Sequence, residues 1–281
     1  MNDNYWNILK QINDHQLEAE KIEFIESLPT EKIKIKSKDG ENLLHALINN
    51  SSINTLIVLI NRGLDINNTN SSSGRNLLFK TEDPKTIEFL LTNGAEINHQ
   101  DSDGWTPLIY HLNNDELIRL LLENGANTSL KTKSEHTFLQ EIIINVDDTQ
   151  ITPKLKLVKY KGVGFEEIDP NGFNLIHFSI LYQKPRALQF LLQNNGNVNT
   201  LTKNEFHISK GEDKILLPKN SSPMDLCNVL IEWANTRASD SIGGEWVYEQ
   251  KLGIYTCLLI LKDELDFKEA IGKAKQLIDN K

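Results

Sequence analysis

Apolar residues recur along this chain in short blocks at helical spacing, and polar turns separate the blocks. Several blocks share one order, in which an apolar helical stretch is followed by a glycine, then a small or acidic residue, and then an asparagine. They are residues 59–67, 90–98, 121–127 and 191–199. We expect the glycine to end each helix, because glycine enters the left-handed backbone conformation without a steric penalty.

The glycines recur at intervals that suit one helix pair each. Gly63, Gly94 and Gly125 are 31 residues apart, and the next intervals, to Gly162 and then to Gly196, are 37 and 34 residues. A second landmark, a glycine followed within a few residues by leucine, precedes each helix pair at residues 39–45, 73–78, 103–108 and 171–177. Helix pairs of this size bury their apolar faces only when neighbouring copies stack on them.

The two landmarks together resemble the ankyrin repeat, whose signature is Gly-x-Thr-Pro-Leu-His before a helix pair that ends in Leu-Leu-x-x-Gly-Ala-x-x-Asn. Residues 104–127 match it best, and we expect Thr106 to cap the inner helix and Pro107 to occupy its first position. The resemblance covers residues 3–233, with weaker copies at 135–139 and 220–226. It implies an all-α ankyrin-repeat solenoid of stacked helix-turn-helix units with hairpin fingers.

The ends of the chain are expected to act as helical caps. Residues 1–36 are predicted to form an N-terminal helix pair, and residues 37–233 the repeats, with a lengthened fourth repeat and a polar insertion at 202–220. Residues 234–281 are predicted to hold a C-terminal insertion and closing helices at 254–261 and 267–278. The length of 281 residues suits one elongated domain or two compact ones.

Charge is distributed unevenly and limits the classes of partner. Residues 1–150 contain 23 acidic and 13 basic residues, a net charge of −10, whereas residues 151–281 carry a net charge of +1. The overall charge of −9 argues against a nucleic-acid backbone or an anionic membrane as the partner. The start of the chain has no signal-peptide pattern, and two cysteines cannot form a disulfide framework, so we expect a cytoplasmic protein.

The residues that carry chemistry give no catalytic or metal pattern. None of the seven histidines lies at metal-ligand spacing from another histidine or a cysteine, so no metal or other cofactor is predicted. The ankyrin resemblance implies that His45 and His177 bond the backbones of neighbouring fingers. Cys227 and Cys257 fall in apolar stretches and are interpreted as core. No enzyme is predicted; if residues 202–281 did hold one, Asp240, Glu245 and Trp246 would be its first candidates.

The ankyrin register assigns candidate contact positions for a partner. The finger row is Glu41, Arg75, Trp105, His136 and Phe173; the groove row is Ala46, Lys80, Tyr110, Glu141 and Phe178; the finger tips are Asp39, Ser73, Asp103, Ser134 and Asn171. From these we select as partner-binding residues Glu41, Arg75, Asp103, Trp105, Tyr110, His136, Glu141, Phe173 and Phe178. The aromatic members occupy positions that packing is not expected to require. The alternative is that Trp105 and Phe173 stack on neighbouring fingers.

Two classes of function remain open, with an enzyme in the C-terminal region as a less favoured third. The first is a monomeric binding module whose acidic front half blocks a basic protein partner. Small bacterial ankyrin proteins of this kind resemble immunity proteins, which neutralise a secreted toxin, and a nuclease toxin would present a basic face. The second class is a secreted effector or a scaffold that acts through the same surface.

Overall fold

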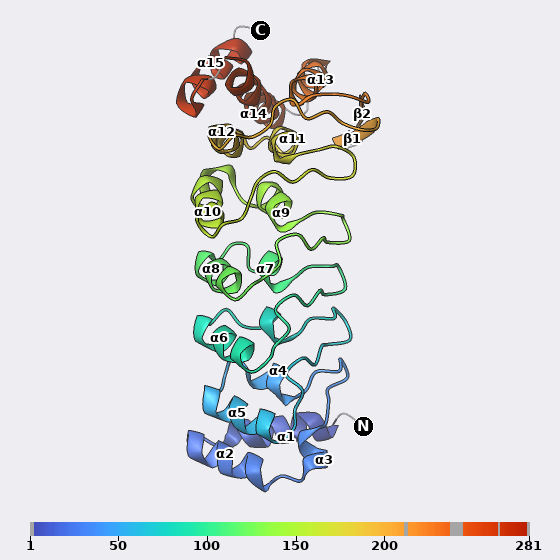
Figure 1. Cartoon of the computed structure of the whole chain (residues 1–281). Coiled ribbons are helices and arrows are strands. Elements are labelled where there is room, and N and C mark those ends of the chain that lie inside the picture. The colour runs from blue at the N-terminus through green and yellow to red at the C-terminus, as the bar shows by residue number, and fades with distance from the viewer. Residues whose placement is uncertain (1–2, 211–212, 237–243, 264, 280–281) are drawn as a thin grey trace. The chain divides into compact units, whose positions relative to one another are not determined.

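The computed structural model describes residues 3–210, 213–236, 244–263 and 265–279, and Figure 1 labels its helices and strands. The chain divides into two compact units, Met1–Phe138 and Leu139–Lys281, which we call unit 1 and unit 2. Both units are built mainly from helix pairs that alternate with extended finger loops.

Unit 1 starts with α1 (Asp3–Asp14), α2 (Glu18–Ser27) and the short α3 (Thr30–Ile33). Helix pairs follow, in each of which we call the first helix inner and the second outer. The pairs are α4 (Leu43–Leu47) with α5 (Ile53–Asn61), the 3-10 helix η1 (Leu77–Phe79) with α6 (Pro84–Thr92), and α7 (Pro107–Tyr110) with α8 (Asp115–Glu123). The outer helices bury one apolar stripe each, as Leu117 and Leu121 of α8 illustrate.

Side-chain caps start the inner helices. The hydroxyl oxygen of Thr106 accepts a hydrogen bond from the N–H of Ile109 at 3.3 Å, and Pro107 occupies the first position of α7. Both expectations for this helix are therefore confirmed. In the two preceding repeats, Asn42 and Asn76 take the place of the threonine and cap α4 and η1 in the same way.

Left-handed residues end the outer helices, as the glycine spacing predicts. The φ angles are 86° at Gly63, 88° at Gly94, 85° at Gly125 and 82° at Gly162. The expectation for Gly196 is wrong, because the left-handed residue there is Asn195, with φ 64°. Gly196 is needed for space instead, since an added Cβ would lie 2.9 Å from the carbonyl oxygen of Leu191.

Unit 2 continues the helix pairs and then adds other elements. Its pairs are α9 (Phe138–Asn145) with α10 (Asp148–Tyr160) and α11 (Leu175–Leu181) with α12 (Pro185–Gln193). They are followed by β1 (Phe206–Lys210), β2 (Asp213–Leu217), α13 (Pro223–Thr236), α14 (Gly244–Asp263) and α15 (Phe267–Asp279). The lengthened fourth repeat is explained by α10, which has 13 residues where α8 and α12 have 9.

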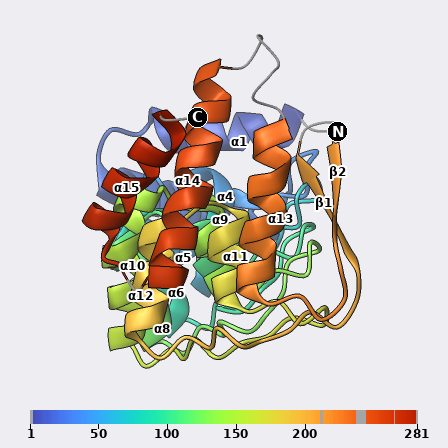
Figure 2. The ribbon, with the colours of Figure 1, turned by 90° about the horizontal axis from the view of Figure 1, so that it is seen from above.

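The polar insertion forms a β-hairpin, which the all-α prediction did not include. β1 and β2 pair antiparallel, with Phe206 opposite Leu217 and Lys210 opposite Asp213. Figure 2 shows the two strands side by side next to α13. The fold of the described residues is otherwise helical, as predicted.

The C-terminal helices cover the end of unit 2. α14 packs against both α13 and α15, and the two buried free thiols, Cys227 of α13 and Cys257 of α14, lie in this core as expected. Residues 237–243 of the predicted C-terminal insertion lie outside the described residues.

Candidate protein-binding surface

Each finger of unit 1 is a loop closed by backbone hydrogen bonds around a left-handed residue. In the third finger, Asp101 donates to the carbonyl of Trp105 at 2.9 Å, and Gly104 donates to the carbonyl of Asp101 at 2.9 Å. Gly104 has φ 77°, and a Cβ added to it would lie 2.9 Å from the backbone nitrogen of Lys133 in the next finger. Glycine is therefore required by the turn and by the close approach of the next finger.

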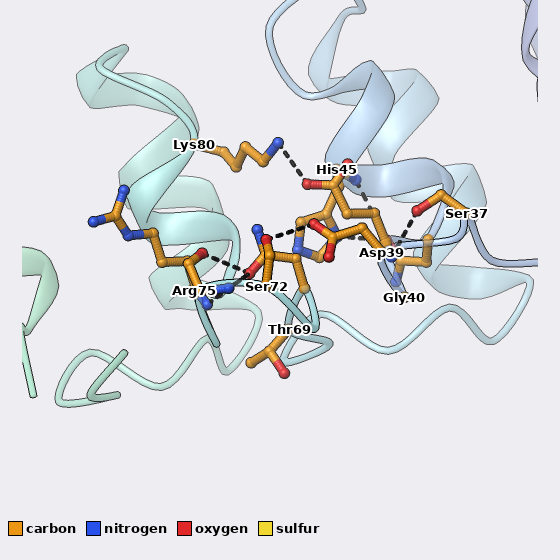
Figure 3. Close-up of polar contacts among 12 residues, drawn as sticks. Ser37, Asp39, Gly40, His45, Thr69, Ser72, Arg75 and Lys80 are labelled. Atoms are coloured by element: carbon orange, nitrogen blue, oxygen red, sulfur yellow. Dashed lines mark hydrogen bonds and ion pairs between the residues drawn. The ribbon is translucent and has the colours of Figure 1, made fainter. Parts of the chain in front are cut away.

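The predicted finger tips join consecutive fingers through their backbone carbonyls. These oxygens accept N–H groups at 2.6–2.8 Å, from Ser71 to Asp39, from Ser102 to Ser73 and from Lys133 to Asp103. At the first tip the hydroxyl of Ser72 also donates to the carboxylate of Asp39 at 2.8 Å (Figure 3). The tips thus fix the spacing of the fingers, while the side chain of Asp103 stays exposed.

The structure brings Glu41 and Lys80 together as an ion pair between neighbouring repeats. Lys80 Nζ lies 2.6 Å from Glu41 Oε1, and both side chains are partly exposed. An exposed pair of this kind contributes up to about 1 kcal/mol. Its charges largely neutralise each other, so Glu41 and Lys80 together add no net charge to the surface.

Arg75 and Tyr110 form the most organised feature of the unit 1 surface. The Arg75 guanidinium lies 4.5 Å from the centroid of the Tyr110 ring, and Arg75 Nε donates to Asp101 Oδ2 at 3.0 Å. The edge of the buried Phe79 ring supports Tyr110, with 5.4 Å between the centroids. Tyr110 itself remains 37% exposed. An exposed aromatic ring held in a fixed orientation loses little entropy when a partner covers it.

An open depression of about 630 Å³ lies beside Tyr110. Its lining includes the exposed acids Glu82 and Asp115 and the amide side chains of Asn113 and Asn114. Its wall is held by the buried His111, whose Nε2 lies 2.8 Å from the carbonyl oxygen of Leu78. The mixture of an aromatic ring, carboxylates and amides suits the positively charged end of a lysine or arginine side chain.

The remaining unit 1 candidates lie near this surface and are less exposed. Trp105 is half-buried, and its backbone N–H is held by Asp101 Oδ1 at 2.9 Å. His136 is half-buried as well, with its backbone N–H donating to Thr132 Oγ1 at 3.3 Å. Both residues are positioned by the backbone of their own finger, so their side chains are presented at defined places.

The three unit 2 candidates, Glu141, Phe173 and Phe178, are buried, so the expectation that packing does not require the two aromatic side chains is wrong. Phe173 is 3% exposed and Phe178 is 5% exposed. Phe206 of the hairpin covers Phe173, with ring centroids 5.1 Å apart, and Tyr182 stacks on Phe178 at 6.2 Å. Glu141 is also buried, and Asn145 Nδ2 donates to its carboxylate at 2.5 Å. Phe173 is covered by the insertion, whereas Phe178 and Glu141 are covered in part by residues of their own repeats.

The two histidines at the repeat's histidine position bond the capping asparagine of their own helix and also interact with the backbone of the next finger. Nδ1 of His45 lies 3.0 Å from Asn42 Oδ1, and Nδ1 of His177 lies 2.8 Å from Asn174 Oδ1. Each ring therefore bonds the cap of its own helix, because an asparagine stands where the family has threonine. The backbone of the next finger, at Arg75 for His45 and at Ser221 for His177, interacts with each ring, as the ankyrin resemblance implies. Burial lowers the pKa of His45, and it lowers that of His177 to about 4.

The described part of the chain also bears on metal binding, membrane insertion and thiol chemistry. Within it, no three histidine, cysteine or acidic side chains gather as metal ligands, and no helix is long and apolar enough to cross a bilayer. Burial raises the pKa of the Cys227 thiol, which makes it a poor nucleophile. Asp240 and the side chains of Glu245 and Trp246 lie outside the described residues.

Sequence reasoning missed Asp101, whose carboxylate positions Arg75 and the third finger. The sequence does contain a pattern that could have identified Asp101. A residue whose side-chain oxygen can accept N–H groups of its own finger recurs three positions before the left-handed finger residue. It is Ser37 before Gly40, Asp101 before Gly104, Thr132 before Glu135 and Asp169 before Gly172. Such residues close tight turns by accepting nearby N–H groups.

Comparisons with known proteins agree with the repeat assignment. Residues 77–151 match the family model for ankyrin repeats (3 copies), so this part of the chain consists of ankyrin repeats and the predicted fold is confirmed. Ankyrin repeats are protein-protein interaction modules and are typically not enzymes. The crystal structure of the ankyrin repeat domain of Bcl-3, a member of the IkappaB protein family, is 26% identical, with a TM-score of 0.39. That match covers 44% of this chain and 55% of the Bcl-3 chain, and no curated protein matches the sequence.

Proposed function

We propose that this chain is a stoichiometric binding module that attaches to a basic protein partner and neutralises it. The observation that carries the proposal is the exposed Tyr110 ring, held by Arg75 and Asp101 beside an acidic depression. The surrounding contacts fix this surface before any partner binds. Aromatic and arginine side chains in such positions supply much of the energy of protein interfaces.

The charge of unit 1 supports a basic partner. Residues 1–138 contain 20 acidic and 13 basic residues, whereas residues 139–281 contain 19 and 17. The Glu41–Lys80 pair neutralises itself, which leaves Glu82, Asp103 and Asp115 as exposed acids around Tyr110 and the third finger. Complementary charge raises the association rate more than it raises the affinity.

In its most specific form, the proposal is that the chain is an immunity protein that acts in the cytoplasm against a toxin. A nuclease toxin presents a basic face to hold phosphates, and an acidic binding surface would cover that face. The support for this form is the acidity of unit 1 together with the resemblance to small bacterial ankyrin proteins. The same surface in a scaffold or secreted effector would bind its partner without abolishing the partner's activity.

Co-expression with a candidate toxin domain tests the proposal. We expect a complex with one copy of each chain, formed from a monomeric free protein and burying on the order of 1,200–2,000 Å² or more. Raising the salt concentration should slow association much more than it speeds dissociation. Toxin activity should fall to background at equal molar amounts. A stable complex in which the toxin keeps its full activity would contradict neutralisation and favour the scaffold.

A further inference from the structure

The hairpin of unit 2 is an enlarged finger. Its base keeps the bonds that close the third finger, because Thr202 donates to the carbonyl of Ser221 at 3.0 Å and Asn220 donates to that of Thr202 at 2.9 Å. Asn220 is left-handed, with φ 60°, like Gly104. Residues 203–219 therefore stand where residues 102 and 103 stand in the third finger. The hairpin grows out of the tip of a finger whose base is unchanged.

The hairpin is fixed to the helices of unit 2 along one face. Ile208 and Leu217 are buried, and the Trp233 indole N–H of α13 donates to Asp213 Oδ2 at 2.8 Å. Lys210 Nζ donates to the carbonyl of Leu181 at 3.1 Å, and Phe206 packs on Phe173. Most two-stranded hairpins are marginally stable alone, and these contacts hold this one in place.

The opposite face and the outer edge of β2 are open. His207, Ser209, Lys214 and Leu216 are all exposed, and their register places them on one face. We infer that the end pair of the ladder, Lys210 and Asp213, is hydrogen-bonded, and hydrogen-bonded and non-hydrogen-bonded pairs alternate from there. Lys214 and Leu216 then direct their backbone groups away from β1, and no described backbone group outside the two strands bonds them. Leu216 is 47% exposed.

The hairpin is also the last finger in the described chain. Asn171 continues the tip pattern, since its carbonyl accepts the N–H of Lys203 at 2.7 Å. Lys219 holds the corresponding position in the hairpin, just before the left-handed Asn220, and its carbonyl accepts no N–H from the described residues. The row of fingers in unit 2 therefore ends in the edge of β2, whose alternate N–H and C=O groups point outward.

We propose that this edge binds an extended segment of a partner protein, which adds beside β2 as a third strand. Unpaired N–H and C=O groups in strand register are satisfied by another extended backbone. The exposed charges of the hairpin, over residues 203–210 and 213–219, are Lys203, Lys214 and Lys219 against one acid, Glu205. The segment that fits alternates acidic residues, which lie near these lysines, with apolar residues, which pack beside Leu216.

The test uses the full chain and an acetylated Glu-Val-Glu-Val-Glu-Val peptide as the probe. We expect saturating peptide to shift the NMR signals of the Lys214 and Leu216 amides and to slow their hydrogen exchange at least about tenfold. A Glu-Val-Glu-Pro-Glu-Val peptide has the same charge but lacks one backbone N–H. It should neither shift these amide signals nor slow their hydrogen exchange. Equal effects of both peptides, or shifts confined to unit 1, would overturn the proposal.

Variants of the edge separate strand pairing from side-chain contact. Leu216→Pro removes an outward N–H and leaves the bonds between β1 and β2 intact, so peptide binding should be lost; Leu216→Thr keeps the N–H and should keep most of it. Lys214→Glu should weaken peptide binding about tenfold, because it places a negative charge beside the acidic residues of the peptide. This variant tests the proposal even if the proline variant does not fold. Self-association of the chain through this edge without peptide would identify a second copy as the occupant and contradict the proposal.

Discussion

Equivalent aromatic residues in units 1 and 2 have opposite roles. Tyr110 and Phe178 hold the same groove position of their repeats, yet Tyr110 is 37% exposed and Phe178 only 5%. Trp105 and Phe173 hold the same finger position, and only Phe173 is fully packed. The difference arises because the hairpin supplies Phe206 as a cover for Phe173, and Tyr182 stacks on Phe178. Repeat register therefore assigns a side chain to a face, and neighbouring side chains, from an insertion or from the repeat itself, decide whether that face is open.

The largest effect on stability is expected for the buried aromatic residue of unit 2, compared with the exposed one of unit 1. Phe173→Ala should lower the free energy of unfolding by about 3–5 kcal/mol, because it leaves a cavity under the hairpin. Tyr110→Ala removes a partly exposed ring and should cost about 1 kcal/mol or less. Urea denaturation of both variants measures the difference. Similar losses of unfolding free energy in the two variants would mean that Tyr110 and Phe173 contribute equally to packing, which would contradict the comparison.

The next effect is a loss of stability in acid that originates in unit 2. Burial lowers the pKa of His177 to about 4 in the folded state, below its ordinary value of 6.5. The unfolded chain then binds the proton more readily, so stability from this group is complete above pH 6.5 and is lost as the pH falls toward 4. The contribution is about 3 kcal/mol.

His177→Gln provides the control for this pH dependence. Burial also lowers the pKa of His45 and His111, so the variant should retain part of the slope of unfolding free energy against pH. We expect the slope between pH 7 and pH 4 to be clearly smaller than in the unaltered protein. An unchanged slope would show that His177 does not titrate as its burial requires.

Glycines at two kinds of position should differ in what they tolerate. Gly172 has φ 90°, and an added Cβ would lie 2.5 Å from the carbonyl oxygen of Leu201, so Gly172→Ala should cost at least about 2 kcal/mol. Gly94 has φ 88° but no atom within 4 Å of an added Cβ, so Gly94→Ala should cost only the conformational penalty of about 1 kcal/mol. Thermal unfolding of the two variants gives the comparison. Equal costs would show that finger contacts add nothing to the turn.

The smallest effect concerns the support of Tyr110. Asp101→Asn keeps the acceptor for the N–H groups of Asp103 and Trp105 but removes the charge that holds Arg75. Stability should fall by about 1 kcal/mol or less, because Arg75 is partly exposed and regains water. Partner affinity should fall more than stability does. If affinity is unchanged while Arg75→Ala weakens it, the carboxylate is not the positioning group.

Much of the fold could be predicted from the sequence because each repeat contains its own residues for starting and ending helices. The glycines after the outer helices, Thr106 and Pro107 act as predicted. The role of Asn195 was missed because asparagine is the second choice for a left-handed residue, and a glycine stood beside it. The hairpin was missed because its strands are short and their apolar face is defined only by the helices they contact.

The candidate surface was harder to predict because it depends on contacts between repeats. Arg75, Asp101 and Tyr110 meet only after the repeats stack, and no local pattern joins them. Glu41 and Lys80 were placed on separate rows, and their pairing follows from the same stacking. Phe173 was misassigned because its cover, Phe206, comes from the insertion and leaves no mark on the repeat itself; Phe178 and Glu141 contact Tyr182 and Asn145 of their own repeats, which the register alone does not reveal.

The central claim, that the working part of the protein is the open surface of unit 1, is tested most directly by affinity capture with two baits. One bait is the unaltered chain and the other carries Trp105→Ala together with Tyr110→Ala, with equal folding checked by circular dichroism. Cells that produce the protein are the source, and quantitative mass spectrometry is the readout. We predict one dominant basic companion, in roughly equal molar amount with the unaltered bait and at least about tenfold depleted with the variant. The same companion at equal abundance on both baits would contradict the account.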